Sequence, residues 1–235
     1  MTADTFIEAL RPHVSEKEKE KLQRFYKGDN PDTAAFGVRF GTVFKTAREF
    51  TDLPLDQVER LMESDFYEVR MGAMAILDYK ARKKKITDDQ RKELFDLYMR
   101  RHDRIDNWDL VDRAAPHVVG GYLFDKSRDP IYELALSENQ WKRRTALYST
   151  LFFLKRGDTQ DTMRLAGELV NDLEDLVNKA VGTLLREVGK TDENLLTAFL
   201  DRTAATMPRT TLRYAIEKLA PPHKRRYLEF SNPGR

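Results

Sequence analysis

The sequence contains no cysteine, and glycine and proline are few, with 11 and 9 copies in 235 residues. The missing thiols exclude disulfide bonds, thiolate nucleophiles and zinc-thiolate sites, and they fit a reducing compartment. No apolar run approaches the roughly 20 residues that a membrane-spanning helix needs. The N-terminal segment also lacks the basic start and apolar centre of a signal peptide. We therefore expect a soluble, cytoplasmic protein that makes no membrane contact.

Histidine is also scarce, and the four copies are scattered along the chain at His13, His102, His117 and His223. None of them shows the spacing of a metal-ligand pair. The sequence therefore predicts no metal site, and we expect no other cofactor.

Positive and negative charges nearly balance, because 41 basic and 39 acidic side chains leave a net charge of only +2. The basic side chains nevertheless gather in four runs: Lys80 to Lys85, Met99 to Arg104, Trp141 to Arg144 and His223 to Arg226. In one interpretation, each run is a solvated helix end whose charge lies near the negative end of the helix dipole. In the other, the runs share one face and form a phosphate-binding surface.

Apolar residues recur at intervals of three and four, as in LDQVERLMES and DQRKELFDLYMRR, and strict alternation is rare. This period is typical of amphipathic helices. Helix starts are predicted by TDDQ at Thr87, SENQ at Ser137 and TDEN at Thr191, because each places a capping side chain before an acidic or amide residue. No low-complexity linker divides the chain. The sequence therefore predicts an all-α protein in which residues 1–235 form a single domain.

A basic residue that precedes a small residue recurs in five helical segments, at Arg70, Arg113, Arg144, Lys179 and Arg213. Successive positions are 43, 31, 35 and 34 residues apart, which suits two-helix repeats of the HEAT or TPR class. Stacked repeats form an α-α superhelix, or solenoid, and we expect the second helices to line a concave basic groove with these side chains. An ordinary helical bundle is the alternative, because small residues are common inside any packed helices.

The segment NWDLVD places Trp108 and Asp112 four residues apart, so both side chains lie on one face of a helix. Arg144 holds a corresponding position one repeat later, and we expect the three side chains to meet in the groove. The alternative is structural: Trp108 belongs to the core, and Asp112 forms an ion pair with Arg144.

These residues belong to an ordered set of motifs that resembles the AlkD-type DNA alkylation repair family, the HEAT-repeat alkylpurine DNA glycosylases. The motifs are FGVRF, YEVR, NWDLVD, SENQWKRRTAL, LVNKAVGTLLREVGKTDENLLTAFL and MPRTTLRYAIEKL, and together they span most of the chain. The resemblance implies a curved stack of helix pairs that holds duplex DNA against a basic concave surface. It also implies base excision repair, by hydrolysis of the N-glycosidic bond of cationic purines of the 3-methyladenine or 7-methylguanine type, without a deep base pocket.

By this resemblance, Asp112 matches the catalytic aspartate of the family and Trp108 matches its groove tryptophan, which lies against the deoxyribose. Arg144 matches the arginine that holds the nearby phosphate backbone. Phe25, in QRFYKGD, corresponds roughly to a DNA-contacting aromatic residue. The other expected DNA contacts are Trp141, Arg143, Lys179, Thr183 and Arg213. The expected partner is double-stranded DNA that contains alkylated bases, bound by a monomer that associates with the nucleoid through this DNA.

The chemistry of base release suits these residue types. An alkylated purine is cationic and leaves as a neutral molecule, so the enzyme must mainly stabilise positive charge on the sugar. A carboxylate such as Asp112 can stabilise this oxocarbenium-like transition state or orient the attacking water. The face of the Trp108 ring adds roughly 0.5 to 2 kcal/mol against a desolvated cation. Such a site needs no metal or redox cofactor.

Thr183, in KAVGTLLRE, stands where the family usually has a second tryptophan that frames the lesion. Threonine has no ring face, so the cation-binding part of the site is weakened unless Trp141 or Tyr148 supplies another ring. A second hypothesis is therefore a non-catalytic solenoid that binds damaged or branched DNA through its backbone. A third is a scaffold that binds peptides in its groove, which an acidic or mixed groove would favour.

Overall fold

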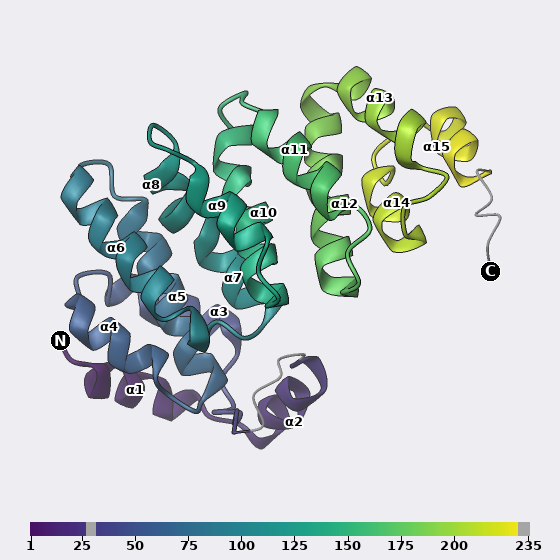
Figure 1. Ribbon diagram of the computed structural model, residues 1–235. Coiled ribbons are helices and arrows are strands. Elements are labelled where there is room, and N and C mark those ends of the chain that lie inside the picture. The colour runs from purple at the N-terminus through teal and green to yellow at the C-terminus, as the bar shows by residue number, and fades with distance from the viewer. Residues whose placement is uncertain (27–31, 230–235) are drawn as a thin grey trace. The chain divides into compact units, whose positions relative to one another are not determined.

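The structure is a computed structural model that describes residues 1–26 and 32–229, without the side chains of Gln23 and Phe25. Helices follow one another along the chain (Figure 1). Within the described residues there is no β-strand, and one isolated bridge pairs Ala34 with Phe66. The predicted all-α class is therefore confirmed. None of the described helices is both long enough and apolar enough to cross a membrane.

The chain divides into two compact units, residues 1–126 and residues 127–235. The single domain that the sequence predicts over residues 1–235 stays a prediction. The helices of the first unit are α1 (Ala3–Leu10), α2 (Glu16–Phe25), α3 (Phe40–Glu49), α4 (Leu55–Met62), α5 (Tyr67–Ala81), α6 (Asp88–Arg100), α7 (Trp108–Ala115) and α8 (Gly121–Leu123). Short helical turns are η1 (Arg11–His13), η2 (His102–Arg104) and the π-helical η3 (Pro116–Gly120).

Helix α5 is the centre of the first unit, because it packs against α3, α4 and α7. Every residue from position 67 to position 78 of this helix is buried. The small side chains in MGAMA allow this close packing. Gly72, for example, lies against Phe6 of α1, and a Cβ atom at this position would overlap the phenylalanine ring. Core residues this tightly packed leave little room for larger side chains.

The second unit consists of α9 (Asp129–Ala135), α10 (Gln140–Leu154), α11 (Gln160–Leu169), α12 (Asp175–Thr191), α13 (Glu193–Thr203), α14 (Arg209–Ala215) and α15 (Pro221–Leu228). Its long helices α10 and α12 pack against each other, and α12 also packs against α14. Gly182 allows the second approach, since a Cβ atom there would lie 2.6 Å from the carbonyl oxygen of Thr211.

The predicted helix starts are confirmed at one site and shifted at two. Thr87 and Gln90 form a capping box at the start of α6, as TDDQ predicts. Ser137 does not cap α10, because the side chain of Asn139 accepts the N–H groups of the first turn instead. Thr191 is likewise the last residue of α12, and Asp192 caps α13. Asn and Asp are equally good caps, so the motif fixes the start only to within two residues.

The five recurring basic residues lie on α5, α7, α10, α12 and α14, in the helical segments that the repeat predicted. The expectation that all five line a groove is wrong for Arg70, whose side chain is 1% exposed. Its guanidinium donates to the carboxylate of Asp106 at 3.0 Å, to the hydroxyl of Thr33 and to the carbonyl oxygen of Ser64. Arg70 therefore joins α5 to the segments on either side of it, because a buried guanidinium needs such partners.

Candidate functional site

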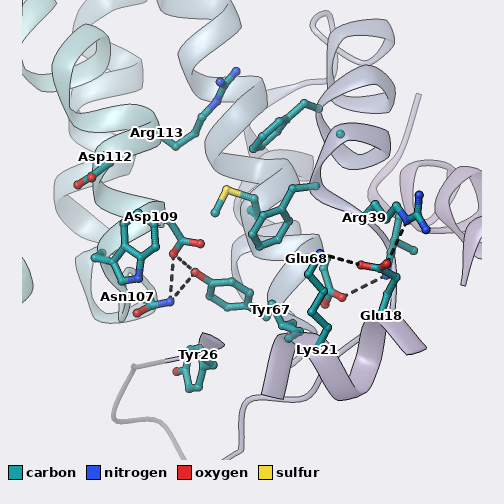
Figure 2. A pocket seen from close by; sticks show the side chains of 17 residues that line it. Glu18, Lys21, Tyr26, Arg39, Tyr67, Glu68, Asn107, Asp109, Asp112 and Arg113 are labelled. Carbon is teal, nitrogen blue, oxygen red and sulfur yellow. Dashed lines mark hydrogen bonds and ion pairs between the residues drawn. The ribbon is translucent and has the colours of Figure 1, made fainter. Parts of the chain in front are cut away.

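The first unit contains a cavity of about 700 Å³. Helices α2, α3, α5 and α7 and the segment before α3 form its walls (Figure 2). The lining residues are Glu18, Lys21, Leu22, Tyr26, Val38, Arg39, Phe40, Gly41, Phe44, Tyr67, Glu68, Met71, Asn107, Trp108, Asp109, Asp112 and Arg113. The volume lies within the range of about 300 to 1,000 Å³ that is usual for small-molecule sites.

Helix α7 begins at Trp108 and buries one of its faces. Leu110, Val111 and Ala114 turn toward the core, whereas Trp108 keeps 38% of its surface exposed. Asp112 follows Trp108 by four residues, and both side chains line the cavity. The structure thus brings together the two residues that the sequence predicted as the catalytic pair. In Figure 2 the carboxylate of Asp112 lies at the edge of the cavity and points away from Tyr67.

A second carboxylate of α7, that of Asp109, lies deeper in the same cavity. Its Oδ1 atom accepts hydrogen bonds from the hydroxyl of Tyr67, from the amide of Asn107 at 3.1 Å and from the backbone N–H of Leu110 at 3.1 Å. Figure 2 shows the first two bonds and shows the other carboxylate oxygen directed toward the middle of the cavity. Asn107, although it is the N-cap residue of α7, uses its side chain for this network and does not cap the helix.

Burial raises the pKa of Asp109 to about 6, and the nearby charge of Asp112 adds to the rise. The hydrogen bond from Tyr67 opposes it. Burial also raises the pKa of Tyr67 well above its usual value, and the charge of Asp109 adds to that effect. Tyr67 therefore remains a hydrogen-bond donor at neutral pH. Carboxylates with pKa values raised in this way are found mainly at functional sites.

Aromatic rings form much of the cavity wall. The rings of Tyr26 and Tyr67 meet edge to face at 5.2 Å between centroids, and Phe40 lies 6.1 Å from Tyr67 and 6.0 Å from Phe44. The hydroxyl of Tyr26 is fixed by a 2.8 Å hydrogen bond that it donates to Asp106. Pairs of rings in this geometry hold one another in place. The wall is therefore a fixed aromatic surface.

The segment before α3 is held in position by one buried side chain. The carboxylate of Glu68 accepts the backbone N–H groups of Phe36 and Gly37 at 2.7 Å each and that of Val38 at 3.2 Å. Gly37 has a φ of +97°, and a Cβ atom there would also lie 2.8 Å from the carbonyl oxygen of Ser15. Only glycine fits this conformation without strain. Glu68 thus fixes the part of the wall that Val38 provides.

Arg113 closes another side of the cavity. Its guanidinium pairs with the buried carboxylate of Asp78 at 3.1 Å and lies over the rings of Phe44 and Tyr79 at 4.7 and 4.8 Å from their centroids. Arg113 shares Asp78 with Arg82, whose Nε lies 2.7 Å from the same carboxylate, and it is partly covered by aromatic rings. It therefore acts as a fixed wall of the cavity.

Two of the predicted DNA contacts, both on α10 in the second unit, are buried. Arg144 is 4% exposed, and its guanidinium donates to the carbonyl oxygen of Leu176 and, at 3.2 Å, to the hydroxyl of Tyr148. It also lies over the Tyr148 ring at 4.7 Å. Trp141 is 3% exposed and in this conformation presents no ring face to a nucleic acid. The meeting of Arg144 with Trp108 and Asp112 stays a prediction.

Other predicted contacts of the second unit carry acidic partners. Arg143 donates to both carboxylate oxygens of Asp172, at 2.7 and 3.0 Å, and its remaining nitrogen donates to the carbonyl oxygen of Ser137. Lys179 pairs with Asp175 at 2.6 Å, one helical turn before it. An arginine with every nitrogen engaged is less available to a phosphate than a lysine with a single, partly exposed pair.

The last predicted contacts differ in how far they reach solvent. Thr183 on α12 is half-buried and Arg213 on α14 is exposed. Phe25 ends α2, and its side chain lies outside the described residues.

Three residues of the site were not predicted from the sequence: Asp109, Tyr67 and Asn107. Two of them stand in NWDLVD itself, where only Trp108 and Asp112 were assigned roles. The available signal was the first acid of that motif, Asp109, one residue after the tryptophan. Its burial depends on α5, which lies about 40 residues earlier in the chain. Within the described residues, no group of three or more histidine, aspartate or glutamate side chains is arranged to hold a metal ion.

The protein is therefore an all-α protein whose first unit contains a cavity lined by aromatic and acidic side chains, Trp108 among them. The chain belongs to the DNA alkylation repair enzyme family, whose model matches residues 6–219. This confirms the resemblance that the sequence motifs carry. No curated protein matches the chain.

Solved structures share the fold at low sequence identity. A predicted DNA alkylation repair enzyme from Enterococcus faecalis is 14% identical, covers 89% of this chain and 98% of its own, and superposes with a TM-score of 0.68. AlkD2 from Streptococcus mutans is 18% identical, covers 92% of this chain and 99% of its own, and has a TM-score of 0.53. The protein smu.31 from Streptococcus mutans UA159 is 18% identical, covers 92% and 98%, and has a TM-score of 0.55.

Proposed function

We propose that this protein is a DNA glycosylase that hydrolyses the N-glycosidic bond of cationic alkylated purines in duplex DNA. The observation that carries the proposal is the pair on α7: Trp108, 38% exposed, and Asp112 line one cavity from one helix. Membership of the DNA alkylation repair enzyme family supports it. Such a site is predicted to have four features: a carboxylate, an exposed ring, a basic contact and a second ring. Asp112 and Trp108 on α7 are the candidates for the first two.

The two residues divide the task. Asp112 is placed at the edge of the cavity, where its carboxylate stabilises the positive charge that develops on the deoxyribose and orients water for attack. Trp108 offers a ring face to the cationic base or sugar. The cationic base departs as a neutral molecule with the electron pair of the N-glycosidic bond, so the protein need not protonate it. The attacking water forms the new C1′–O bond and gives its proton to the carboxylate of Asp112 or to solvent. We expect exposed or partly exposed cations of the second unit, such as Arg213 and Lys179, to contact the phosphates of the DNA.

A second function is favoured by Thr183, which offers no ring where the family usually has one. In that case the protein binds damaged or branched DNA through its backbone and does not release a base. One experiment distinguishes the two functions: DNA binding and base release are measured on the same alkylated duplex. Both predict binding that weakens steeply with salt, by a slope set by the number of neutralised phosphates. Only the first predicts free base.

The test of the glycosylase function is the release of free base by the wild type and by Asp112→Asn at equal occupancy of the DNA. Asparagine keeps the shape of aspartate and removes its charge, so we expect release to fall about 10²-fold or more while DNA affinity changes little. Asp96→Asn is the matched control, because Asp96 lies on α6 in a surface pair with Lys92. Equal release by Asp112→Asn and the wild type would remove Asp112 from the mechanism.

A further inference from the structure

Helix α7 begins without a side-chain cap. Its N-cap residue, Asn107, makes no side-chain bond to the first turn, and the bond from the N–H of Val111 to the carbonyl oxygen of Asn107 is long at 3.4 Å. The first N–H groups of a helix need acceptors outside the helical ladder. Asp109 supplies one of them, because its Oδ1 atom accepts the N–H of Leu110 at 3.1 Å. The first turn of α7 therefore depends on a side chain of its own.

The same Oδ1 atom joins this turn to α5 (Figure 2). It accepts the hydroxyl of Tyr67, the first residue of α5, and the amide of Asn107, which also donates to the Tyr67 hydroxyl at 2.9 Å. Tyr67 is fully buried, and its ring packs against the rings of Tyr26 and Phe40. Asp109 thus ties the start of α7 to a fixed point of the core.

Asp109 stands between the two residues of α7 to which the proposed function assigns tasks. Trp108 directly precedes it, and Asp112 follows it by three residues, so both belong to the part of the helix that Asp109 holds. Burial and, to a smaller extent, the charge of Asp112 raise the pKa of Asp109. The two carboxylates are therefore close enough to act on each other.

The other charged groups that face the cavity from α2, from the segment before α3, from α5 and from η3 have partners within the protein. The pairs are Glu18 with Lys21 and Arg39, Asp106 with Arg70, Asp78 with Arg113 and His117, and Glu68 with three backbone N–H groups. Among the described residues, no basic side chain pairs with Asp109, whose carboxylate is held by hydrogen bonds alone.

We propose that Asp109 is a positioning residue of the site: its carboxylate, bonded to Tyr67, fixes the first turn of α7 and so the places of the Trp108 ring and the Asp112 carboxylate. The ionised form does this best, because a charged acceptor holds O–H and N–H donors more tightly than a neutral one. Protonation of Asp109 therefore loosens the turn. The effect on base release rests on the proposed function, whereas the effect on Trp108 does not.

The first test follows Trp108 in the full chain without DNA. Trp108 is exposed and adjacent to Asp109, whereas Trp141, the second of the two tryptophans, is buried. Because the pKa of Asp109 is about 6, we expect the fluorescence and its quenching by iodide to change with a midpoint near that pH. Asp109→Asn and Trp108→Phe should both lack this transition, and Asp96→Asn on α6 should keep it. A group other than Asp109 that titrates in this range acts in wild type and Asp109→Asn alike.

Tyr67→Phe tests the assigned bond. Burial raises the pKa of Asp109, and the hydrogen bond from Tyr67 opposes the rise. The variant keeps the ring and removes the donor, so the midpoint of the Trp108 transition should move to higher pH. A midpoint equal to that of the wild type, or no transition in the wild type, would overturn the inference.

The second readout is release of free base from a 7-methylguanine duplex, with protein in excess. We expect Asp109→Asn to release base about tenfold more slowly than the wild type at about pH 7.5, with little change in DNA affinity, because a small misplacement of reacting groups is costly. The wild-type rate should fall toward that of the variant as the pH is lowered through about 6, and the variant should lack this step. Equal rates at both pH values would overturn the role of Asp109 in the reaction.

The two proposals fail in different ways. Base release without a pH transition of Trp108 would leave the glycosylase function intact and overturn the positioning role. A transition that Asp109→Asn lacks, without base release by the wild type, would support the positioning of Trp108 and remove the catalytic function.

Discussion

The charge of Asp109 should cost the protein stability at neutral pH. A folded pKa of about 6, against an ordinary value of 3.8, means that the native state holds a proton more tightly than the unfolded chain does. Between these two pH values the native state therefore binds more protons, so the free energy of unfolding falls as pH rises. Above about pH 6 the full cost is present, and below about pH 4 it is absent.

The size of this cost follows from the shift. The difference of about 2 pKa units, at about 1.4 kcal/mol each, gives about 3 kcal/mol at neutral pH. Water that enters the cavity screens the charge, so we expect about 1 to 3 kcal/mol. Asp109→Asn removes the charge and keeps an oxygen that accepts from Tyr67, from Asn107 and from the backbone of Leu110. The variant should therefore be more stable than the wild type at pH 7.5, and nearly equal to it at pH 4.

The assay is thermal or urea unfolding of the two proteins at both pH values, with Asp96→Asn as the control. A gain of 1 kcal/mol corresponds to a rise of about 2 to 4 °C in the unfolding midpoint for a chain of this length. If Asp109→Asn is less stable than the wild type at pH 7.5, or gains equally at both pH values, the charge of Asp109 does not destabilise the native state. A pH-dependent gain would mean that the chain retains a destabilising carboxylate in its cavity, as residues kept for function often are.

Two further predictions concern the wall and the missing ring. Glu68→Gln leaves one oxygen for the three backbone N–H groups that Glu68 now accepts, so we expect the free energy of unfolding in urea to fall by about 2 to 4 kcal/mol. A fall below about 0.5 kcal/mol would show that the segment before α3 keeps its conformation without these hydrogen bonds. Thr183→Trp should increase the rate of base release at saturating protein if the absent ring limits catalysis, and an unchanged rate would mean that the site is framed by other residues.

The sequence predicted the helices well because their signal is local. Apolar residues at intervals of three and four reveal an amphipathic helix, and a Thr-Asp-Asp-Gln motif reveals its start, without knowledge of the rest of the chain. The starts of α10 and α13 were misplaced for the same reason, since Asn139 and Asp192 are local competitors of Ser137 and Thr191. Similarly, the repeat placed Arg70 on the correct helix but predicted that it lines a groove, whereas its side chain is buried. Its partner Asp106 is 36 residues away, and no periodicity shows it.

Some residues that line the cavity were named from the sequence, and others were not. Trp108 and Asp112 were candidates because their spacing puts them on one face of one helix, and the resemblance to the family suggested their roles. The cavity behind them could not, because it depends on Tyr26, Phe40 and Tyr67, which come from three separate segments of the chain. Asp109 was visible in the motif, yet an acid in the first turn of a helix is usually a solvated group that favours the helix dipole. Only its burial by α5 distinguishes it from such a group.

The glycosylase function is best tested by a single-turnover measurement of free purine released from a 7-methylguanine duplex, with protein in excess and every duplex bound. We expect release by the wild type and by Asp96→Asn, and release about 10²-fold slower or more by Asp112→Asn at equal occupancy. No release by the wild type on fully bound duplex would contradict it, and the protein would then be a binder of DNA structure.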